Sequence, residues 1–217
     1  MKQVSSPGVG ALDARYVRVI GDDIGDVSGG NYLEIKSGGE INLHGTAKIE
    51  RHLRVGAGSW SGGASAPTQG FDDSFGYLEF DNSSDDDGFY TLIVPWRWDT
   101  VTDVGFSVDW YYTGGQDNGT VCWAIDYKSI KAGEAVTGAG TIVAKTSAGT
   151  HTAGQMVRTV FTDKIPATDL EAGDTIGLKL FRDVDGGEDD GDTLATNARI
   201  INTHFHFTMD KLGLYNG

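Results

Sequence analysis

Histidine, aspartate and tryptophan side chains are this sequence's candidates for chemistry. His204 and His206 stand two residues apart, in the segment His204-Phe205-His206. Residues two apart lie on one face of a β-strand, so the two imidazoles point the same way and could share a metal ion. In a symmetric oligomer, one histidine from each chain could bind an ion on the axis. Solvated or interface histidines are the simpler interpretation, because the sequence shows no third ligand.

The densest acidic run extends from residue 183 to residue 192. Carboxylates gathered in a glycine-rich loop are the oxygen ligands that Ca²⁺ requires. The candidate ligands are Asp183, Asp185, Asp190 and Asp192. The run departs from the EF-hand pattern, since Gly187 occupies its fifth position. We therefore favour a solvated hairpin loop and expect no cofactor, with bound Ca²⁺ as the alternative.

Three tryptophans are candidates for binding carbohydrate. Trp96 and Trp98 flank Arg97, and they share a face if this segment is extended. Exposed, they could stack on the sugar rings of a host surface glycan. Trp60 lies in a stretch rich in glycine and serine and is a third candidate. We favour the other interpretation, in which Trp96 and Trp98 close the edge of the core and Trp60 is an anchor packed on a neighbouring surface.

Several functional classes are disfavoured by composition and by missing motifs. The sequence contains no G-x-S-x-G, no His-Glu-x-x-His and no Walker loop, so we expect no enzyme activity. A formal net charge of -14 disfavours nucleic-acid binding. No stretch approaches the ~20 apolar residues of a membrane helix, so membrane insertion is not expected. The start of the chain does not read as a signal peptide, and one cysteine, Cys122, fits folding in a cytoplasm.

The stretch from residue 102 to residue 127 predicts the elements that must position these side chains. Apolar and polar residues alternate on both sides of the turn pair Asn118-Gly119. This period of two predicts two strands, and the turn pair predicts that they form a β-hairpin. The aromatic residues on the apolar face require a second sheet to cover them.

Alternating segments continue through the C-terminal part and predict an all-β fold. The 32 glycines and only 4 prolines favour many short strands joined by tight turns. Predicted strands lie at residues 76–81, 89–94, 104–112, 120–127, 141–146, 156–162, 175–182 and 199–209. Eight strands at this spacing, with no sustained helical period, predict a jelly-roll-like β-sandwich over residues 75–217.

The N-terminal part is too poor in apolar residues to fold alone. Residues 1–15 lack periodicity and are expected to form an arm, and residues 56–74 have the composition of a Gly/Ser-rich linker. Residues 16–55 contain short strand-like runs, for which we favour a β stalk shared between chains over docking on the sandwich. The predicted attachment and oligomerisation residues are Leu12, Tyr16, Leu33, Ile35, Ile41, Leu43, Ile49, Leu53 and Val55.

Parts of the sequence resemble proteins of tailed bacteriophages. Residues 12–22, beginning Leu-Asp-Ala-Arg-Tyr, resemble a stretch near the start of phage fibre proteins. Residues 39–55 resemble the line that precedes the β-sandwich of phage head-fibre and tail-appendage proteins, although Arg51-His52 stands where an acidic residue is usual. Further landmarks of the same sandwich lie at residues 108–111, 121–126, 152–155, 170–174 and 182–183.

The resemblance implies a non-enzymatic virion protein, made in the host cytoplasm and assembled as a homotrimer. Its N-terminal arm would attach to capsid or tail proteins, residues 16–55 would form a threefold stalk, and the sandwich would project outward. A head fibre or capsid decoration protein is the expectation that we favour, because the chain is short for a complete tail fibre. The alternative is a tail fibre or receptor-binding tip that recognises host surface carbohydrate.

Overall fold

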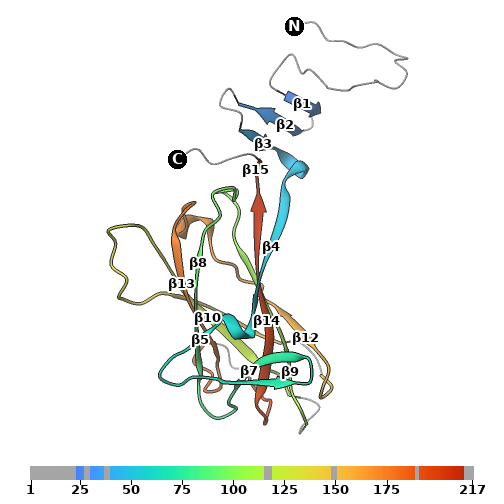
Figure 1. Ribbon diagram of the computed structural model, residues 1–217, viewed down its shortest axis with the longest axis vertical. Coiled ribbons are helices and arrows are strands. Elements are labelled where there is room, and N and C mark those ends of the chain that lie inside the picture. The colour runs from blue at the N-terminus through green and yellow to red at the C-terminus, as the bar shows by residue number, and fades with distance from the viewer. Residues whose placement is uncertain are drawn as a thin grey trace, which may run out of the picture.

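The computed structural model describes residues 23–26, 30–36, 40–114, 119–147, 151–188 and 191–212. They form two larger antiparallel sheets and one small sheet, with three short 3-10 turns as the helical structure of the described part. Figure 1 shows the small sheet at one end of the long axis, reached from the sandwich through β4 (Ile49–Gly56) and β14 (Ala198–Met209). No helical segment among the described residues is long and hydrophobic enough to traverse a membrane.

The two larger sheets form the sandwich. The five-stranded sheet has the order β11 (Thr141–Thr146), β10 (Cys122–Ile130), β13 (Thr175–Arg182), β8 (Asp87–Ile93) and β5 (Ser61–Gly62). The six-stranded sheet has the order β12 (Val157–Val160), β9 (Gly105–Tyr111), β14, β7 (Phe75–Phe80) and β6 (Thr68–Asp72), with β4 paired to β14. The 3-10 turns are η1 (Gly45–Ala47), η2 (Ala57–Ser59) and η3 (Ala167–Asp169).

Strands β7 to β14 have the jelly-roll connection. Consecutive strands alternate between the two sheets except for β10 and β11, which form a hairpin in one sheet, and the antiparallel pairs nest as β7 with β14, β8 with β13, β9 with β12 and β10 with β11. Two interleaved Greek keys of this kind define a jelly roll. The predicted all-β, jelly-roll-like sandwich is confirmed, and each of its eight predicted strands overlaps one of these elements.

The predicted hairpin between β9 and β10 is wrong. β9 pairs with β12 and β14 in one sheet, whereas β10 pairs with β11 and β13 in the other. The predicted apolar faces are nevertheless correct, because Trp110 and Trp123 are buried and meet edge to face across the core at 6.1 Å between ring centroids. Alternation identifies the face of a strand that is covered, and the chain between these strands crosses from one sheet to the other.

A β-bulge in β14 changes which side chains of this strand face the core. The register shifts between Ile200 and Asn202, after which Thr203, Phe205 and Phe207 are buried. Unbroken alternation predicts that Ile201 joins the buried face, but the extra residue of the bulge leaves it only partly buried. His204 and His206 consequently project from the outer face of the six-stranded sheet.

The sandwich begins earlier in the chain than the sequence predicts. β4 pairs with β14 from Gly56 to Ile49, although all of its residues except Gly56 fall in the predicted stalk. β5 and β6 pair with β8 and β7, although their residues fall in the predicted linker. Glycine-rich composition indicates a low β-strand propensity, but backbone hydrogen bonds to a neighbouring strand still place these residues in the sheets.

The small sheet consists of the strands that precede β4 among the described residues of the predicted stalk, together with the strand that follows β14. Its order is β1 (Asp23–Asp26), β2 (Asn31–Ile35), β3 (Ile41–Leu43) and β15 (Lys211–Leu212). The register pairs Leu33 with Leu43, Ile35 with Ile41, and Ile41 with Leu212. These five side chains therefore share one face, and of them only Leu43 is buried.

Candidate functional site

β4 forms an edge of the six-stranded sheet. Its residues pair with β14, and among the described residues no strand pairs with its other side. An edge of this kind presents backbone N–H and C=O groups to which a strand of another chain can add. β4 is also the segment that links the small sheet to the sandwich (Figure 1). The edge and the small sheet thus lie on one continuous part of the chain.

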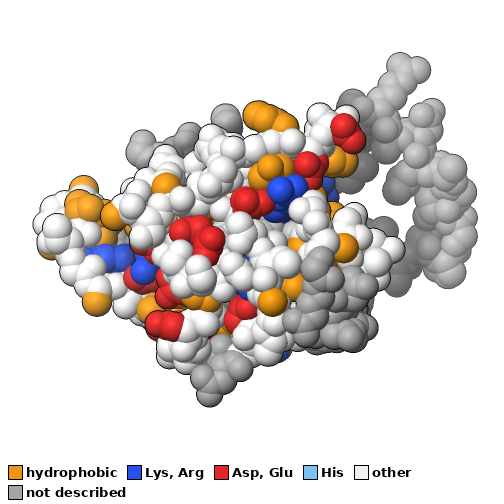
Figure 2. Space-filling model, turned by 90° about the horizontal axis from the view of Figure 1, so that it is seen from below, with side chains coloured by type: hydrophobic (Ala, Val, Ile, Leu, Met, Phe, Trp, Pro, Cys, Tyr) orange, Lys and Arg blue, Asp and Glu red, His pale blue; other side chains and the backbone are white. Residues whose placement is uncertain are grey.

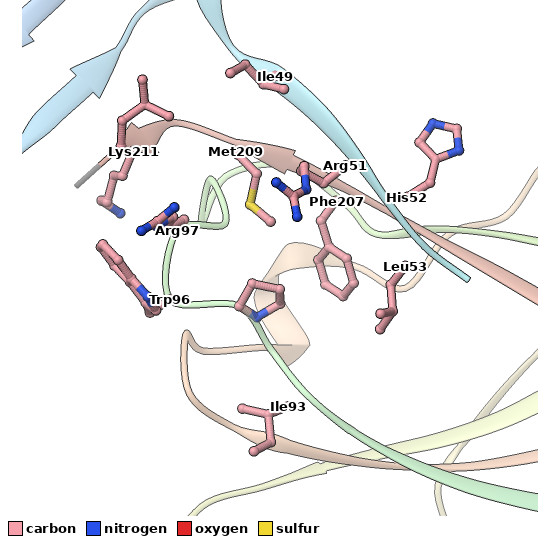
Figure 3. A pocket seen from close by; sticks show the side chains of 12 residues that line it. Ile49, Arg51, His52, Leu53, Ile93, Trp96, Arg97, Phe207, Met209 and Lys211 are labelled. Atoms are coloured by element: carbon pink, nitrogen blue, oxygen red, sulfur yellow. The ribbon is translucent and has the colours of Figure 1, made fainter. Parts of the chain in front are cut away.

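A groove of about 360 Å³ lies beside β4, at the end of the sandwich that faces the small sheet. Figure 3 shows Ile49, Leu53, Phe207 and Met209 along one side of it, with Ile93 and Trp96 opposite. The complete lining is Ile49, Arg51, His52, Leu53, Ile93, Pro95, Trp96, Arg97, Phe207, Met209, Lys211 and Leu212. The groove therefore joins hydrophobic side chains from β4, β8, β14 and β15 with three basic ones.

Hydrophobic exposure at this groove is unusually high for core-facing positions of a strand. Ile49 and Leu53 lie on the face of β4 that carries Val55, which is 2% exposed and part of the core. Ile49 is nevertheless 43% exposed and Leu53 39%. Across the groove, Ile93 follows the buried Leu92, lies on the outer face of β8 and is 66% exposed. β4 extends beyond the part of the sandwich that covers Val55, so its first residues have no such cover. A large exposed apolar patch of this kind marks a binding surface.

The opposite end of the molecule has a different surface. Figure 2 views the end of the sandwich remote from the small sheet, where acidic, basic and hydrophobic side chains are interspersed. Exposed hydrophobic side chains on this part of the chain, such as Phe71 and Phe75, come from β6 and β7. Single surface hydrophobics need no explanation by themselves. The groove beside β4 is the stronger candidate for binding.

The predicted attachment residues divide into four groups. Leu33, Ile35, Ile41 and Leu43 come together on one face of the small sheet, and Ile49 and Leu53 line the groove. Val55 is wrong as an oligomerisation residue, because it packs inside the sandwich. Leu12 and Tyr16 lie outside the described residues.

Two of the three predicted sugar-stacking tryptophans are wrong. Trp60 is 2% exposed and packs on Tyr90, with ring centroids 5.5 Å apart. Trp98 is fully buried, and its Nε1–H donates to the carbonyl of Thr102 at 3.0 Å. A tight turn follows Pro95, whose carbonyl accepts from the Trp98 N–H at 2.9 Å, so the segment is not extended. Trp96 alone remains a candidate, since it lines the groove with Arg97 over its ring at 4.9 Å.

The predicted pairing of His204 with His206 is replaced by two separate clusters on the outer face of the six-stranded sheet. His204 is 2% exposed, and its Nε2 lies 2.8 Å from Oδ2 of the equally buried Asp109. Arg158 donates to the same carboxylate through Nε at 2.6 Å and Nη2 at 2.8 Å. Burial raises the pKa of Asp109, but the bonds from Arg158 and His204 outweigh it and hold that pKa below its usual range. His204 is therefore committed to an ion cluster in which it and Asp109 are buried and Arg158 is partly exposed.

We expect Asp109→Asn to destabilise the protein at neutral pH and to matter less in acid. Loss of the charged acceptor should cost roughly 1.5–3 kcal/mol at pH 7. The folded-state pKa of Asp109 is lowered from 3.8, so the ionised group stabilises the fold above that value, and this stabilisation is lost as pH falls through the folded pKa. Urea unfolding at pH 7 and in acid measures both effects, with the exposed Asp163→Asn as control. An Asp109→Asn deficit that persists unchanged in acid would contradict this assignment.

His206 belongs to the second cluster, with Glu50 and His52 of β4. Glu50 Oε1 lies 2.8 Å from His52 Nε2 and 3.2 Å from His206 Nδ1. The hydrogen bond from His206 lowers the pKa of Glu50, with burial opposing and His52 adding to the lowering. Burial lowers the pKa of His206, which favours its neutral imidazole. Glu50 and His52 were missed from the sequence, although their spacing of two residues in a predicted strand places them on one face.

The acidic loop does not assemble the four predicted Ca²⁺ ligands. Both oxygens of Asp192 accept from the buried Arg182 at 2.8 Å, so this carboxylate is committed to an ion pair. Asp190 lies outside the described residues. Asp183 and Asp185 instead lie near Asp85, and Asp183 accepts backbone N–H groups of its own loop. Such bonds are those of a self-capped turn, and one carboxylate oxygen from each of Asp85, Asp183 and Asp185 lies within 4.8 Å of the other two.

The chain was compared with protein families, curated proteins and solved structures. No family model and no curated protein matches it. Among solved structures, isomalto-dextranase of Arthrobacter globiformis T6 in complex with panose has a TM-score of 0.40 and 14% identity, covering 71% of this chain and 23% of that one. A structure of infectious bursal disease virus, Gx strain, has a TM-score of 0.35 and 14% identity, covering 76% and 33%. This chain thus spans at most a third of those chains, and similarity at this level carries no argument about function.

Proposed function

We propose that the protein is a non-enzymatic structural component of a bacteriophage virion, a homotrimeric head fibre or capsid decoration protein. Residues 12–22 and 39–55 carry the sequence resemblance that supports a location in a virion and assembly about a threefold axis. The jelly roll supplies a rigid body that projects from the particle. The small sheet and β4 supply the surfaces on which copies of the chain meet.

One observation carries the proposal: hydrophobic side chains of β2, β3 and β4 are left without cover along the end of the molecule. Leu33, Ile35 and Ile41 share an incompletely buried face, and Ile49 and Leu53 stand over the groove beside an open strand edge. Burial of one such side chain stabilises by about 1.5–3 kcal/mol. A partner copy that covers several of them would gain enough to hold an oligomer, and closed symmetry would repeat the same contact for every copy.

The groove also has the charge expected for a self-recognition surface. Arg51, Arg97 and Lys211 line it, while the chain as a whole has a net charge of -14. Acidic surface of a second copy is thus attracted to this basic rim, which sets the orientation of the contact. Hydrophobic side chains then supply its free energy.

Light scattering tests the assembly. We expect the full chain to have about three times the chain mass of 23.1 kDa, and the double variant Ile49→Asp, Leu53→Asp to dissociate at concentrations at least ~100-fold higher than the parent protein. Point variants are preferable to a truncation at Phe75, because removal of residues 1–74 would also delete strands β4, β5 and β6 of the sandwich. The matched control is Val101→Asp, since Val101 is 78% exposed and lies outside the groove.

A monomeric parent protein would overturn the assembly, as would a double variant that stays trimeric with unchanged affinity. Attachment to the particle is tested separately by incorporation of chains that lack residues 1–20, which we expect to fail.

The alternative function, a tail fibre or tip that binds host carbohydrate, rests on Trp96 at the groove. Glycan binding that is lost in Trp96→Ala, with the fold intact, would favour it.

A further inference from the structure

We propose that Glu50, His52 and His206 form a binding site for a transition-metal dication, Zn²⁺ in the first place. One ligand atom from each of the three side chains lies within 4.8 Å of the other two. The site lies on the outer face of the six-stranded sheet. His52 also borders the groove, whereas Glu50 and His206 do not line it. It goes beyond the proposed assembly function and does not depend on it.

Strand register brings the three ligands together. His52 of β4 is the direct cross-strand partner of His206 of β14, and Glu50 precedes His52 by two residues on the same face. The two imidazole rings have centroids 4.2 Å apart. Nε2 of His52 and Nδ1 of His206 both approach Oε1 of Glu50. Two nitrogens and one oxygen thus converge, as they must around a shared ion.

A further residue of the six-stranded sheet orients His206 for this role. Nε2 of His206, the nitrogen that does not face Glu50, lies 3.3 Å from Oγ of Ser107. Ser107 is a fixed partner because it is 1% exposed in β9. Metal-binding histidines commonly donate their second ring N–H to a neighbouring oxygen, which fixes the tautomer and the ring orientation. Ser107 can accept that hydrogen bond when Nδ1 carries the metal.

The ligand set selects the kind of ion. Two imidazoles with one carboxylate suit Zn²⁺ and neighbouring first-row dications, whereas Ca²⁺ and Mg²⁺ prefer sites made wholly of oxygen. Three protein ligands leave a further position for water. Glu50 and His206 also line a cavity of about 200 Å³, together with Lys164, so there is room for that water beside the ion.

His204 is not a ligand of this site. Its ring centroid is 6.3 Å from that of His206, but its Nε2 is hydrogen-bonded to Asp109 beside the Arg158 guanidinium. The histidine pair that the sequence singles out therefore contributes one ligand, and β4 provides the other two. A bound ion would cross-link β4 to β14, which places metal binding on the strand that connects the small sheet to the sandwich.

Thermal unfolding of the untagged, chelator-treated full chain with added Zn²⁺ tests the site. We expect a rise in Tm of about 5–10 °C at a zinc concentration one hundred times the dissociation constant, because the ion binds the folded chain. Bound Co²⁺ should show the visible absorption of a site with low coordination number. Ca²⁺ at the same concentration should cause no comparable rise in Tm. Zinc affinity should fall at acidic pH, where imidazole nitrogens are protonated.

Variants assign the binding to these residues. His52→Ala and His206→Ala should each lower the zinc affinity at least ~10-fold, and Ser107→Ala about 10-fold through the orientation of His206. His52 has an exposed side chain, so His52→Ala should keep the fold and stability of the zinc-free protein. The matched control is His44→Ala, because His44 faces Glu34 on the small sheet without a second histidine.

Three outcomes would overturn the site. They are zinc affinity weaker than millimolar in the parent protein, unchanged affinity in both His52→Ala and His206→Ala, or loss of binding in His44→Ala instead. Light scattering of the same samples measures their molar mass with and without zinc. The mass should not depend on zinc, because the proposed trimer does not require the ion, so zinc binding and assembly are tested separately.

Discussion

Asp192→Ala should lower the free energy of unfolding by roughly 3–5 kcal/mol, because it leaves a buried guanidinium without its counter-charge. Arg182 is fully buried, and its side chain donates to both oxygens of Asp192 at 2.8 Å. It also donates to the carbonyls of Leu194, Thr196 and Asp81. All five N–H groups of the guanidinium are thereby used, and this arrangement fixes the segment that leads into β14. Urea unfolding at pH 7 measures the loss.

A second variant separates the buried charge from the packing around it. The double variant Arg182→Met, Asp192→Ala removes both charges, so it should recover part of the stability that Asp192→Ala loses. Recovery should be incomplete, because the carbonyls of Leu194 and Thr196 lose their donors. Glu171→Ala is the control: it removes the partner of exposed Lys131 and should leave the Tm unchanged. Equal losses in the single and double variants would contradict the charge argument.

Much of the sandwich could be predicted from the sequence because one face of its strands is apolar and buried. Val104, Phe106, Val108 and Trp110 alternate with more polar residues, and all four are buried as predicted. The pairing of strands could not be predicted in the same way. A turn pair such as Asn118-Gly119 is typical of hairpins, but the jelly roll requires the chain to change sheets at this connection. Which strand lies beside which depends on how two sheets close over one core.

The N-terminal elements show a further limit of composition. Trp60 stands in a Gly/Ser-rich stretch and is buried, as its interpretation as an anchor predicts, whereas Phe71 of the same stretch is 82% exposed. Neither composition nor local spacing indicates that β5 and β6 pair with sandwich strands. β5 pairs with β8 and β6 with β7, and no local pattern indicates these pairs. Short glycine-containing strands have little β-strand propensity of their own.

For the candidate sites, the sequence predicts only which side chains share one face of a strand, and not the partners that they meet. The segment from His204 to His206 correctly predicts two imidazoles on one face of a strand. The partner of each is set by register: His204 meets Asp109, and His206 meets Glu50, which is 156 residues away in the chain. The groove also requires residues from four strands and a loop. Sequence periodicity contains the direction of each side chain but not the neighbour that it will contact.

Trp110→Ala should lower the free energy of unfolding by about 3–5 kcal/mol, since it removes the largest kind of side chain from the centre of the core. Trp110 is fully buried, packs edge to face on Trp123 and His151, and donates from Nε1 to Oγ1 of Thr159 at 2.9 Å. It lies between the two sheets and also bonds β9 to β12. The loss therefore combines a cavity with a broken hydrogen bond, and urea unfolding measures it.

Thr159→Val separates these two contributions. This variant keeps the indole in the core but removes the acceptor of its N–H, so it should cost about 1–3 kcal/mol and less than Trp110→Ala. Phe71→Ala is the matched aromatic control, because Phe71 is 82% exposed and its loss should change stability by no more than about 0.5 kcal/mol. A Trp110→Ala loss as small as that of Phe71→Ala would show that the two sheets do not close over this residue. Since the groove lies at the far end of β4 from this part of the core, Trp110→Ala should still self-associate below its lowered Tm, which distinguishes a core defect from an assembly defect.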